Sequence, residues 1–226
     1  MKKPLIFAVD DDPQVLQAIV RDLRAEYRKN YRIVSTESAN QALEALKEFK
    51  LTNQPVALFL SDQRMPEMLG VDFLERAMEL YPDAKRVLLT AYSDIEAAIK
   101  AINDVQLDYY LMKPWDPPEE KLYPVLNEYL DIWQAGFRPQ FEGIKVAGYQ
   151  WSPKSHDIKE FLAGNLVPYR WFDVATSEEA KQLVSLAEIA HTDLPAVFFE
   201  DGSHLNDPDV MEVARKIGMR PEASED

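Results

Sequence analysis

The chain has 226 residues, and its 25 Lys and Arg against 39 Asp and Glu give a formal net charge of −14. It contains no cysteine and only three histidines, which excludes disulfides, thiolate metal sites and cysteine nucleophiles and disfavours a histidine-rich metal site. The acidic balance argues against a general binder of nucleic-acid backbones. No apolar run approaches the roughly 20 residues of a membrane span, and the N-terminus is interpreted as a strand rather than a signal peptide. We therefore expect a cytoplasmic protein with no nucleic-acid and no membrane partner.

Residues 1–133 alternate between short apolar runs and segments in which apolar residues have helical spacing. Strands are predicted for residues 4–9, 31–35, 56–60, 86–89 and 107–112. Helices are predicted for residues 13–28, 39–49, 70–80, 95–102 and 122–133. This alternation predicts an α/β domain in which a five-stranded parallel sheet is covered by helices on both faces.

A second alternation follows a segment, residues 134–142, that contains Gly and Pro and is interpreted as a linker. Strands are predicted for residues 144–149, 168–174 and 196–199, and helices for 157–163, 177–189 and 210–217. Asp201-Gly202 is the predicted turn of a hairpin. We expect a smaller α/β domain over residues 143–220, followed by an acidic tail over 221–226.

Chemically active side chains follow the predicted strands of the first domain. They are carboxylates, a hydroxyl and a lysine: Asp10, Asp11, Asp12, Asp62, Thr90 and Lys113. The carboxyl ends of parallel strands meet at one edge of a sheet, so these groups are expected to converge there. Neighbouring carboxylates repel one another, and Mg²⁺ is the cation that such oxygens favour. Asp62 could then act as a nucleophile toward phosphorus, with Lys113 and Thr90 contacting phosphoryl oxygens.

Each acid taken alone also has a simpler interpretation as a helix cap or a solvated loop residue. Asp12, for example, precedes Pro13, and proline favours the first position of a helix. For any one acid the two interpretations weigh about evenly. Because these acids all follow predicted strands, the interpretation as a functional site is favoured for the set as a whole.

Residues 4–133 resemble the receiver domain of two-component response regulators, which has a flavodoxin-like doubly wound fold. Four stretches carry the resemblance in chain order: residues 7–13 (FAVDDDP), 61–66 (SDQRMP), 88–91 (LLTA) and 110–115 (YLMKPW).

The resemblance implies a phosphorylation site that depends on Mg²⁺. The implied metal ligands are three carboxylates and one main-chain oxygen: Asp10, Asp11, Asp62 and the backbone carbonyl of Arg64. Asp62 would accept a phosphoryl group from a cognate histidine kinase or phosphotransfer protein, with Lys113 and Thr90 assisting. A cis bond to Pro114 would aim the lysine into the site. Thr90 and Tyr110 would form the switch pair that changes the face made by the fourth helix, fifth strand and fifth helix.

Two positions lie two residues beyond the expected site residues. Arg64 follows Asp62 at this spacing and Tyr92 follows Thr90. We hypothesise that their bulk flanks the path of attacking water and slows loss of the phosphoryl group. The alternative, that both are simply exposed, weighs nearly as much.

Residues 143–220 resemble a thioredoxin- or glutaredoxin-like domain. Ser152 and Ser155 stand where a redox protein of that fold carries its Cys-x-x-Cys, and Pro195 matches the cis-proline segment. Serine forms no disulfide, so dithiol exchange is excluded. His156 beside Ser155 is interpreted as a surface residue rather than part of a hydrolase site.

Four aromatic residues of this domain are interpreted as core, in preference to a binding surface: Trp151, Tyr169, Trp171 and Phe172.

Three functional hypotheses follow. In the first, phosphorylation of Asp62 changes contacts of the receiver with the second domain or with a partner. In the second, the chain is the N-terminal regulatory portion of a flavin-dependent, thioredoxin-reductase-like oxidoreductase, with a flavoprotein domain or subunit as partner. In the third, weaker one, the receiver is a scaffold that is never phosphorylated. Homodimer formation through the fourth helix, fifth strand and fifth helix is compatible with the sequence, and no enzymatic activity is expected beyond chemistry at Asp62.

Overall fold

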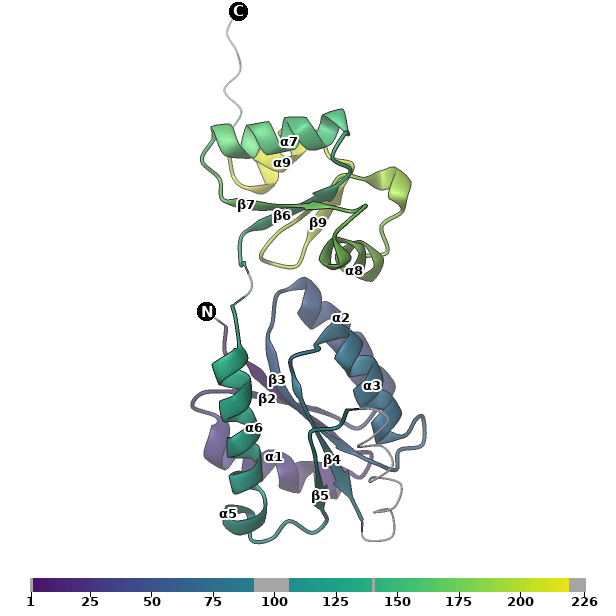
Figure 1. Ribbon diagram of the computed structural model, residues 1–226, viewed down its shortest axis with the longest axis vertical. Coiled ribbons are helices and arrows are strands. Elements are labelled where there is room, and N and C mark those ends of the chain that lie inside the picture. The colour runs from purple at the N-terminus through teal and green to yellow at the C-terminus, as the bar shows by residue number, and fades with distance from the viewer. Residues whose placement is uncertain (1, 92–105, 140, 220–226) are drawn as a thin grey trace, which may run out of the picture. The chain divides into compact units, whose positions relative to one another are not determined.

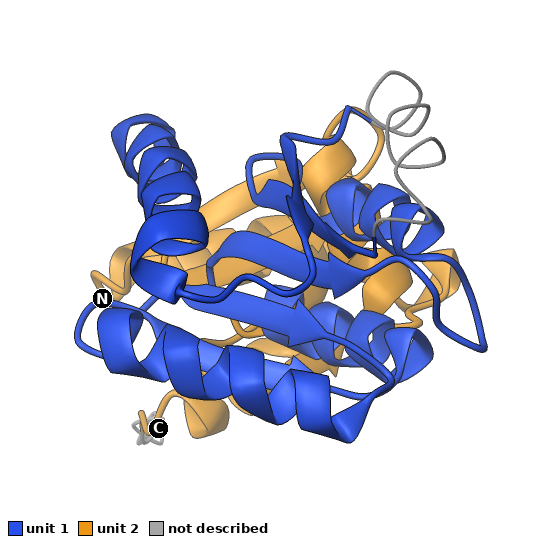
Figure 2. Ribbon diagram, turned by 90° about the horizontal axis from the view of Figure 1, so that it is seen from below, with its two compact units in different colours: residues 1–50, 54–139 blue, residues 51–53, 140–226 orange. Residues whose placement is uncertain are grey.

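The computed structural model describes residues 2–91, 106–139 and 141–219. The chain forms two compact units, distinguished by colour in Figure 2. One comprises residues 1–50 and 54–139, and the other comprises residues 51–53 and 140–226. No helix of the described ranges combines the length and the apolar character needed to span a membrane.

The first unit contains a five-stranded sheet in which every paired strand is parallel (Figure 1). Its strands are β1 (Leu5–Val9), β2 (Arg32–Thr36), β3 (Val56–Asp62), β4 (Lys85–Thr90) and β5 (Tyr109–Met112). The spatial order is β2-β1-β3-β4-β5, which confirms the predicted parallel, doubly wound sheet. The order makes β1 and β3 neighbours, and their register pairs Val9 with Ser61.

Helices cover both faces of this sheet. They are α1 (Pro13–Tyr27), α2 (Ala39–Leu51), α3 (Gly70–Leu80), α5 (Pro118–Lys121) and α6 (Tyr123–Gly136). Side chains of a strand alternate between faces, so Ile6 and Ala8 pack with α1 and α6, whereas Phe7 and Val9 pack with α2 and α3. Both faces of β1 and β3 are therefore apolar, which explains their continuous hydrophobic runs.

The second unit has a four-stranded mixed sheet in the order β7-β6-β8-β9. Its elements are β6 (Ile144–Gly148), α7 (Pro153–Gly164), β7 (Tyr169–Asp173), α8 (Glu178–Leu186), the 3₁₀ helix η2 (His191–Asp193), β8 (Ala196–Phe198), β9 (His204–Asn206) and α9 (Val210–Lys216). The pair β6–β7 is parallel, and the pairs β6–β8 and β8–β9 are antiparallel. The β8–β9 hairpin turns at the predicted position, where Gly202 has a φ of 82°. Two apolar clusters, one containing Phe172 and one containing Val146, lie in this unit.

Several element boundaries differ from the sequence predictions. Helix α6 continues to Gly136, three residues into the expected linker, while α7 begins at Pro153 because the Ser152 hydroxyl caps it by accepting from the Ser155 N–H (3.3 Å). The predicted helix over residues 95–102 lies outside the described residues, as does Tyr92.

The prediction that Trp151 belongs to the core is wrong. Its side chain is 88% exposed, because it lies in the turn between β6 and α7 rather than on a strand. Phe172 is buried as predicted, since it faces the interior from β7, and Tyr169 and Trp171 are half-buried. Apolar composition alone does not distinguish a turn aromatic from a strand aromatic.

Candidate functional site

The candidate site lies at the carboxyl edge of the parallel sheet, where β1, β3 and β5 end. Asp10 directly follows β1, Asp62 is the last residue of β3 and Lys113 directly follows β5. Because Val9 pairs with Ser61, the next residues of the two strands, Asp10 and Asp62, are brought together. The predicted convergence of these groups follows from the register of the sheet.

The ammonium group of Lys113 joins the two carboxylates. Its Nζ lies 2.7 Å from Oδ2 of Asp10 and 2.5 Å from Oδ1 of Asp62. The second oxygen of each carboxylate accepts from the main chain: Oδ1 of Asp10 from the Asp12 N–H (3.0 Å), and Oδ2 of Asp62 from the Arg64 N–H (2.8 Å). Each carboxylate is thus held in a fixed orientation by two donors.

Burial and charge act against each other in this cluster. Asp10 is 1% exposed, and burial raises its pKa although the hydrogen bonds from Lys113 and Asp12 oppose the rise. Burial lowers the pKa of Lys113, but its hydrogen bonds to Asp10 and Asp62 outweigh that effect and leave the pKa raised. Lys113 is therefore a permanent positive charge at neutral pH.

Three carboxylates of this edge could hold a cation. Ligand oxygens of Asp10, Asp11 and Asp62 all lie within 4.8 Å of one another. Asp12, by contrast, caps α1, since its Oδ1 accepts from the N–H of Gln14 (2.8 Å) and Val15 (3.4 Å). For Asp12 the simpler interpretation as a helix cap is confirmed.

Thr90 and Tyr110, the expected switch pair, lie on the neighbouring strands β4 and β5. Thr90 is fully buried, its hydroxyl donates to the carbonyl of Ala91 (3.2 Å), and its own carbonyl accepts from the Lys113 N–H (2.9 Å). Tyr110 is half-buried and packs against the apolar cluster of α2 and α3, with its ring stacked on Tyr109 at 5.9 Å. No direct Thr90–Tyr110 hydrogen bond is present among the described residues.

Three features that support the site are not part of the sequence predictions. A Cβ on Gly70 would overlap the backbone carbonyl oxygen of Asp62, so the first residue of α3 has room only for glycine. Glu67, in the loop between Asp62 and α3, accepts from the Ser38 hydroxyl (2.7 Å) and the Asn40 N–H (3.2 Å) at the start of α2. These features depend on contacts between separate segments of the chain, which local sequence patterns do not predict. The only sequence signal for any of them is that Gly70 is one of just seven glycines.

The third feature is a buried hydrogen bond between α1 and the segment that follows Lys113. The Trp115 indole N–H donates to Oδ2 of Asp22 (2.9 Å), and the other oxygen of Asp22 pairs with Arg21 (2.8 Å). Asp22 and Trp115 are 5% and 6% exposed. This hydrogen bond anchors the chain two residues beyond Lys113. The Lys113–Pro114 peptide bond is cis, as are Asp116–Pro117 and Leu194–Pro195.

In the second unit, Ser155 and Pro195 lie beside Gly148, the last residue of β6. A Cβ on Gly148 would be 2.6 Å from Oγ of Ser155 and 2.9 Å from Cβ of Pro195, so both border the end of β6. Ser155 is fully buried, and its hydroxyl has no hydrogen-bond partner among the described residues. His156 is exposed and lies 3.7 Å from Glu160 one turn further along α7.

Residues 6–122 match the response regulator receiver domain family, and the chain belongs to this family. Among its relatives is the hydrogenase transcriptional regulatory protein HoxA of Cupriavidus necator, 35% identical over 116 residues, which are 51% of this chain and 22% of that protein. The chain thus spans about a fifth of the length of this curated relative.

Solved structures with similar sequences cover the first unit. The signal receiver domain of an HD domain-containing protein from Pseudomonas fluorescens Pf-5 has a TM-score of 0.50 and 31% identity, and the match covers 60% of this chain and 92% of that one. An uncharacterized protein from Neptuniibacter caesariensis has a TM-score of 0.52 and 34% identity, with 62% and 98% covered. The chain therefore contains a two-component response regulator receiver domain.

Proposed function

We propose that Asp62 accepts a phosphoryl group from a phosphohistidine of a histidine kinase or phosphotransfer protein. The observation that carries this proposal is the contact of Lys113 with both Asp10 and Asp62 at the carboxyl edge of the sheet. A positive charge fixed beside a nucleophilic carboxylate is suited to bind the incoming phosphoryl oxygens. Membership of the receiver family supports the same chemistry.

In the transfer, an oxygen of the Asp62 carboxylate attacks phosphorus. A P–O bond forms while the P–N bond to the donor histidine breaks, and the imidazole keeps the electron pair of that bond. Lys113 then exchanges its bond to Asp62 for one to a phosphoryl oxygen, and Thr90 supplies a hydroxyl at the same edge. Both groups stabilise the phosphoryl oxygens, whose two negative charges replace the single charge of the Asp62 carboxylate at a buried position.

The acidic residues of the site fit a bound Mg²⁺. The ligands would be three carboxylates, those of Asp10, Asp11 and Asp62, and the main-chain carbonyl oxygen of Arg64. An all-oxygen set of this kind is the chemistry that Mg²⁺ prefers. When bound, the ion supplies positive charge to the phosphoryl oxygens. Lys113 alone cannot neutralise three carboxylates and a phosphoryl group, which is the physical reason for expecting the ion.

Phosphorylation would act on the rest of the domain through Thr90 and Tyr110. The Thr90 hydroxyl bonds only to its neighbouring carbonyl at 3.2 Å among the described residues, so it is available to turn toward a phosphoryl oxygen. Tyr110 could then turn inward against β4, changing the surface near β5. Slow hydrolysis through the bulk of Arg64 and Tyr92 belongs to the same proposal, and Arg64 is exposed beside Asp62.

For the second unit we propose a thioredoxin-like fold without redox chemistry. The sheet order β7-β6-β8-β9, with one parallel and two antiparallel pairs, supports this assignment. So does the approach of Ser155 and Pro195 to the end of β6. We propose that this unit or a separate partner receives the change in the receiver; no observation favours the flavoprotein alternative.

Addition of beryllofluoride, a mimic of the phosphoryl group, tests the proposal without a kinase. Trp115 is buried two residues from Lys113, so tryptophan fluorescence should change saturably on adding beryllofluoride with Mg²⁺, and not with either alone. The change should disappear in D62N and persist in D83N, an exposed acid outside the cluster. No change in the wild type, or an equal change in D62N, would favour a scaffold that is never phosphorylated.

A further inference from the structure

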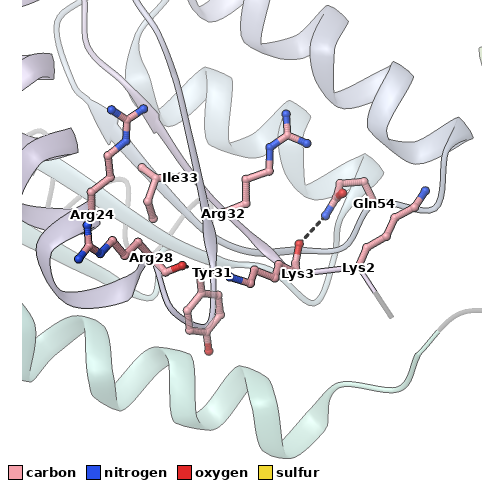
Figure 3. A pocket seen from close by; sticks show the side chains of 8 residues that line it. All are labelled: Lys2, Lys3, Arg24, Arg28, Tyr31, Arg32, Ile33 and Gln54. Carbon is pink, nitrogen blue, oxygen red and sulfur yellow. Dashed lines mark hydrogen bonds between the residues drawn. The ribbon is translucent and has the colours of Figure 1, made fainter.

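A group of positive side chains lies at the amino edge of the first unit's sheet, opposite the carboxyl edge that holds Asp62. This basic cluster, drawn in Figure 3, consists of five residues: Lys2, Lys3, Arg24, Arg28 and Arg32. Lys2 and Lys3 precede β1, Arg24 and Arg28 lie at the end of α1, and Arg32 opens β2. Three separate segments therefore converge on one small surface.

The cluster surrounds a hollow of about 530 Å³. Its other lining residues are Tyr31, Ile33 and Gln54, and no carboxylate of the described residues lines it. The hollow is open to solvent over much of its extent. The wall thus combines cations with the apolar surface of Tyr31 and Ile33.

The backbone that presents these cations is fixed. The buried Gln54 amide donates to the Lys3 carbonyl (2.8 Å), and the Arg32 N–H donates to the Pro4 carbonyl (2.9 Å). Lys3 in turn donates from its Nζ to the Arg28 carbonyl (3.3 Å), which joins the segment before β1 to the end of α1. The cations are therefore presented from fixed positions of the backbone, while their side chains are exposed.

Stabilisation of a helix end explains only part of the cluster. Lys3 and Arg24 are placed to interact favourably with the carbonyls at the end of α1. That effect does not require Arg32, whose guanidinium lies over the Phe49 ring at 6.0 Å. In the described part of the chain, Lys3, Arg24, Arg28 and Arg32 form no ion pair with a carboxylate, although the sequence has 39 acids. Among the described residues, no ion pair with a carboxylate therefore offsets the electrostatic repulsion among these four cations.

We propose that the basic cluster binds a compact ligand carrying two or more phosphate groups. Guanidinium groups offer paired N–H donors that match phosphate oxygens, and three arginines here can act together. A long nucleic acid is disfavoured because the chain has a net charge of −14 despite the cluster, so its other surfaces repel an extended polyanion. A small polyphosphate, in contrast, is repelled less, because it need not extend over those other surfaces.

Calorimetric titration of the full chain tests the proposal, with tripolyphosphate in one arm and ATP in the other. EDTA keeps the carboxylate site free of Mg²⁺ during both titrations. Equal affinities would identify the polyphosphate as the recognised group, and tighter binding of ATP would add packing of the nucleoside on Tyr31 and Ile33. Binding in both arms should weaken as salt is raised.

Two double variants from different segments locate the site. R24Q/R28Q and K3Q/R32Q should each weaken binding by about tenfold or more, because each removes charged hydrogen-bond donors. A charge-matched control, R76Q/R215Q, changes two exposed arginines outside the cluster and should bind as the wild type does. Circular dichroism verifies that all three variants are folded.

Three results would overturn the proposal. The first is the absence of binding by the wild type in either arm. The second is binding that both cluster variants retain, or that the control loses to the same extent. The third is a single-stranded oligonucleotide that displaces ATP and binds more tightly, which would make the surface a nucleic-acid site instead.

Discussion

At the scale of single residues, the carboxylate of Asp62 depends on its immediate neighbours for its position. Lys113 holds one oxygen at 2.5 Å and the Arg64 N–H holds the other at 2.8 Å. Gly70 packs against the carbonyl of the same residue. The proposed nucleophile is thus oriented through its side chain and through its backbone, as a phosphoryl transfer that relies on positioning would require.

Replacement of Gly70 by alanine tests the backbone part of this arrangement. The added Cβ would overlap the Asp62 carbonyl oxygen, so β3 or α3 must shift, at a cost of about 1–3 kcal/mol in the free energy of unfolding. Phosphorylation by acetyl phosphate should slow as Asp62 moves. Chemical denaturation and a phosphorylation time course measure the two effects.

Gly136→Ala is the matched control, because nothing lies within 4 Å of a Cβ at that helical position. Alanine there should leave stability unchanged or raise it by up to about 1 kcal/mol. Equal behaviour of the two variants would show that the close approach at Gly70 has no effect on the site.

At the scale of elements, Glu67 ties the loop after β3 to the start of α2. Hydrogen bonds from the Ser38 hydroxyl and the Asn40 N–H lower the pKa of the Glu67 carboxyl. A lowered pKa in the folded state stabilises the fold above the unfolded pKa, and this contribution is lost as pH falls through the folded value. The loop that carries Arg64 is therefore fastened by an ionised carboxylate.

Glu67→Gln should lower the melting temperature at pH 7, with the difference from wild type closing as pH falls below about 4.5. Melting curves from pH 3 to pH 7 measure it. Glu75, on the exposed side of α3, forms no hydrogen bond within the described residues, so Glu75→Gln should show no such trend. A gap between Glu67→Gln and wild type that stays constant with pH would contradict this explanation.

The turn between β6 and α7 permits a test of the fold proposed for the second unit. Ser152 caps α7 and accepts from the Ser155 N–H, so cysteines at both positions would be adjacent at a helix N-terminus. S152C/S155C should form a disulfide that dithiothreitol reduces, and the thiol at position 152 should titrate below the ordinary pKa of about 8.5. Thiol counting and a pH titration of alkylation measure both; two permanently free thiols would argue against a thioredoxin-like site.

The sequence predicts the elements of the first unit better than it predicts the contacts between them. Periodicity places β1 and β3, and the general rule for parallel sheets places Asp10 and Asp62 at one edge. Contacts across the fold, such as Glu67 with α2 or Trp115 with Asp22, depend on which strands are neighbours, and local patterns do not contain that information. The error at Trp151 has the same origin, because exposure is decided by tertiary packing.

At the scale of the whole molecule, the buried residues that form each apolar cluster in the described part of the chain come from one unit. Leu162 is fully buried in the cluster between α7 and the second sheet. Leu162→Ala should destabilise its unit by about 2–5 kcal/mol. Hydrogen exchange should rise in peptides of residues 141–219 and be unchanged in peptides of 2–91; a rise of equal size in both would contradict separate cores.

For the whole molecule, we propose Asp62 as the single phosphoacceptor. The most direct measurement is incubation with acetyl phosphate and Mg²⁺, reductive trapping of the acyl phosphate with borohydride, and mass spectrometric mapping of the product. The modification should occur once, at Asp62, and should be absent after chelation of Mg²⁺ and in D62N. A wild-type chain that acquires no phosphoryl group, or a modification mapped to another residue, would contradict the assignment of Asp62.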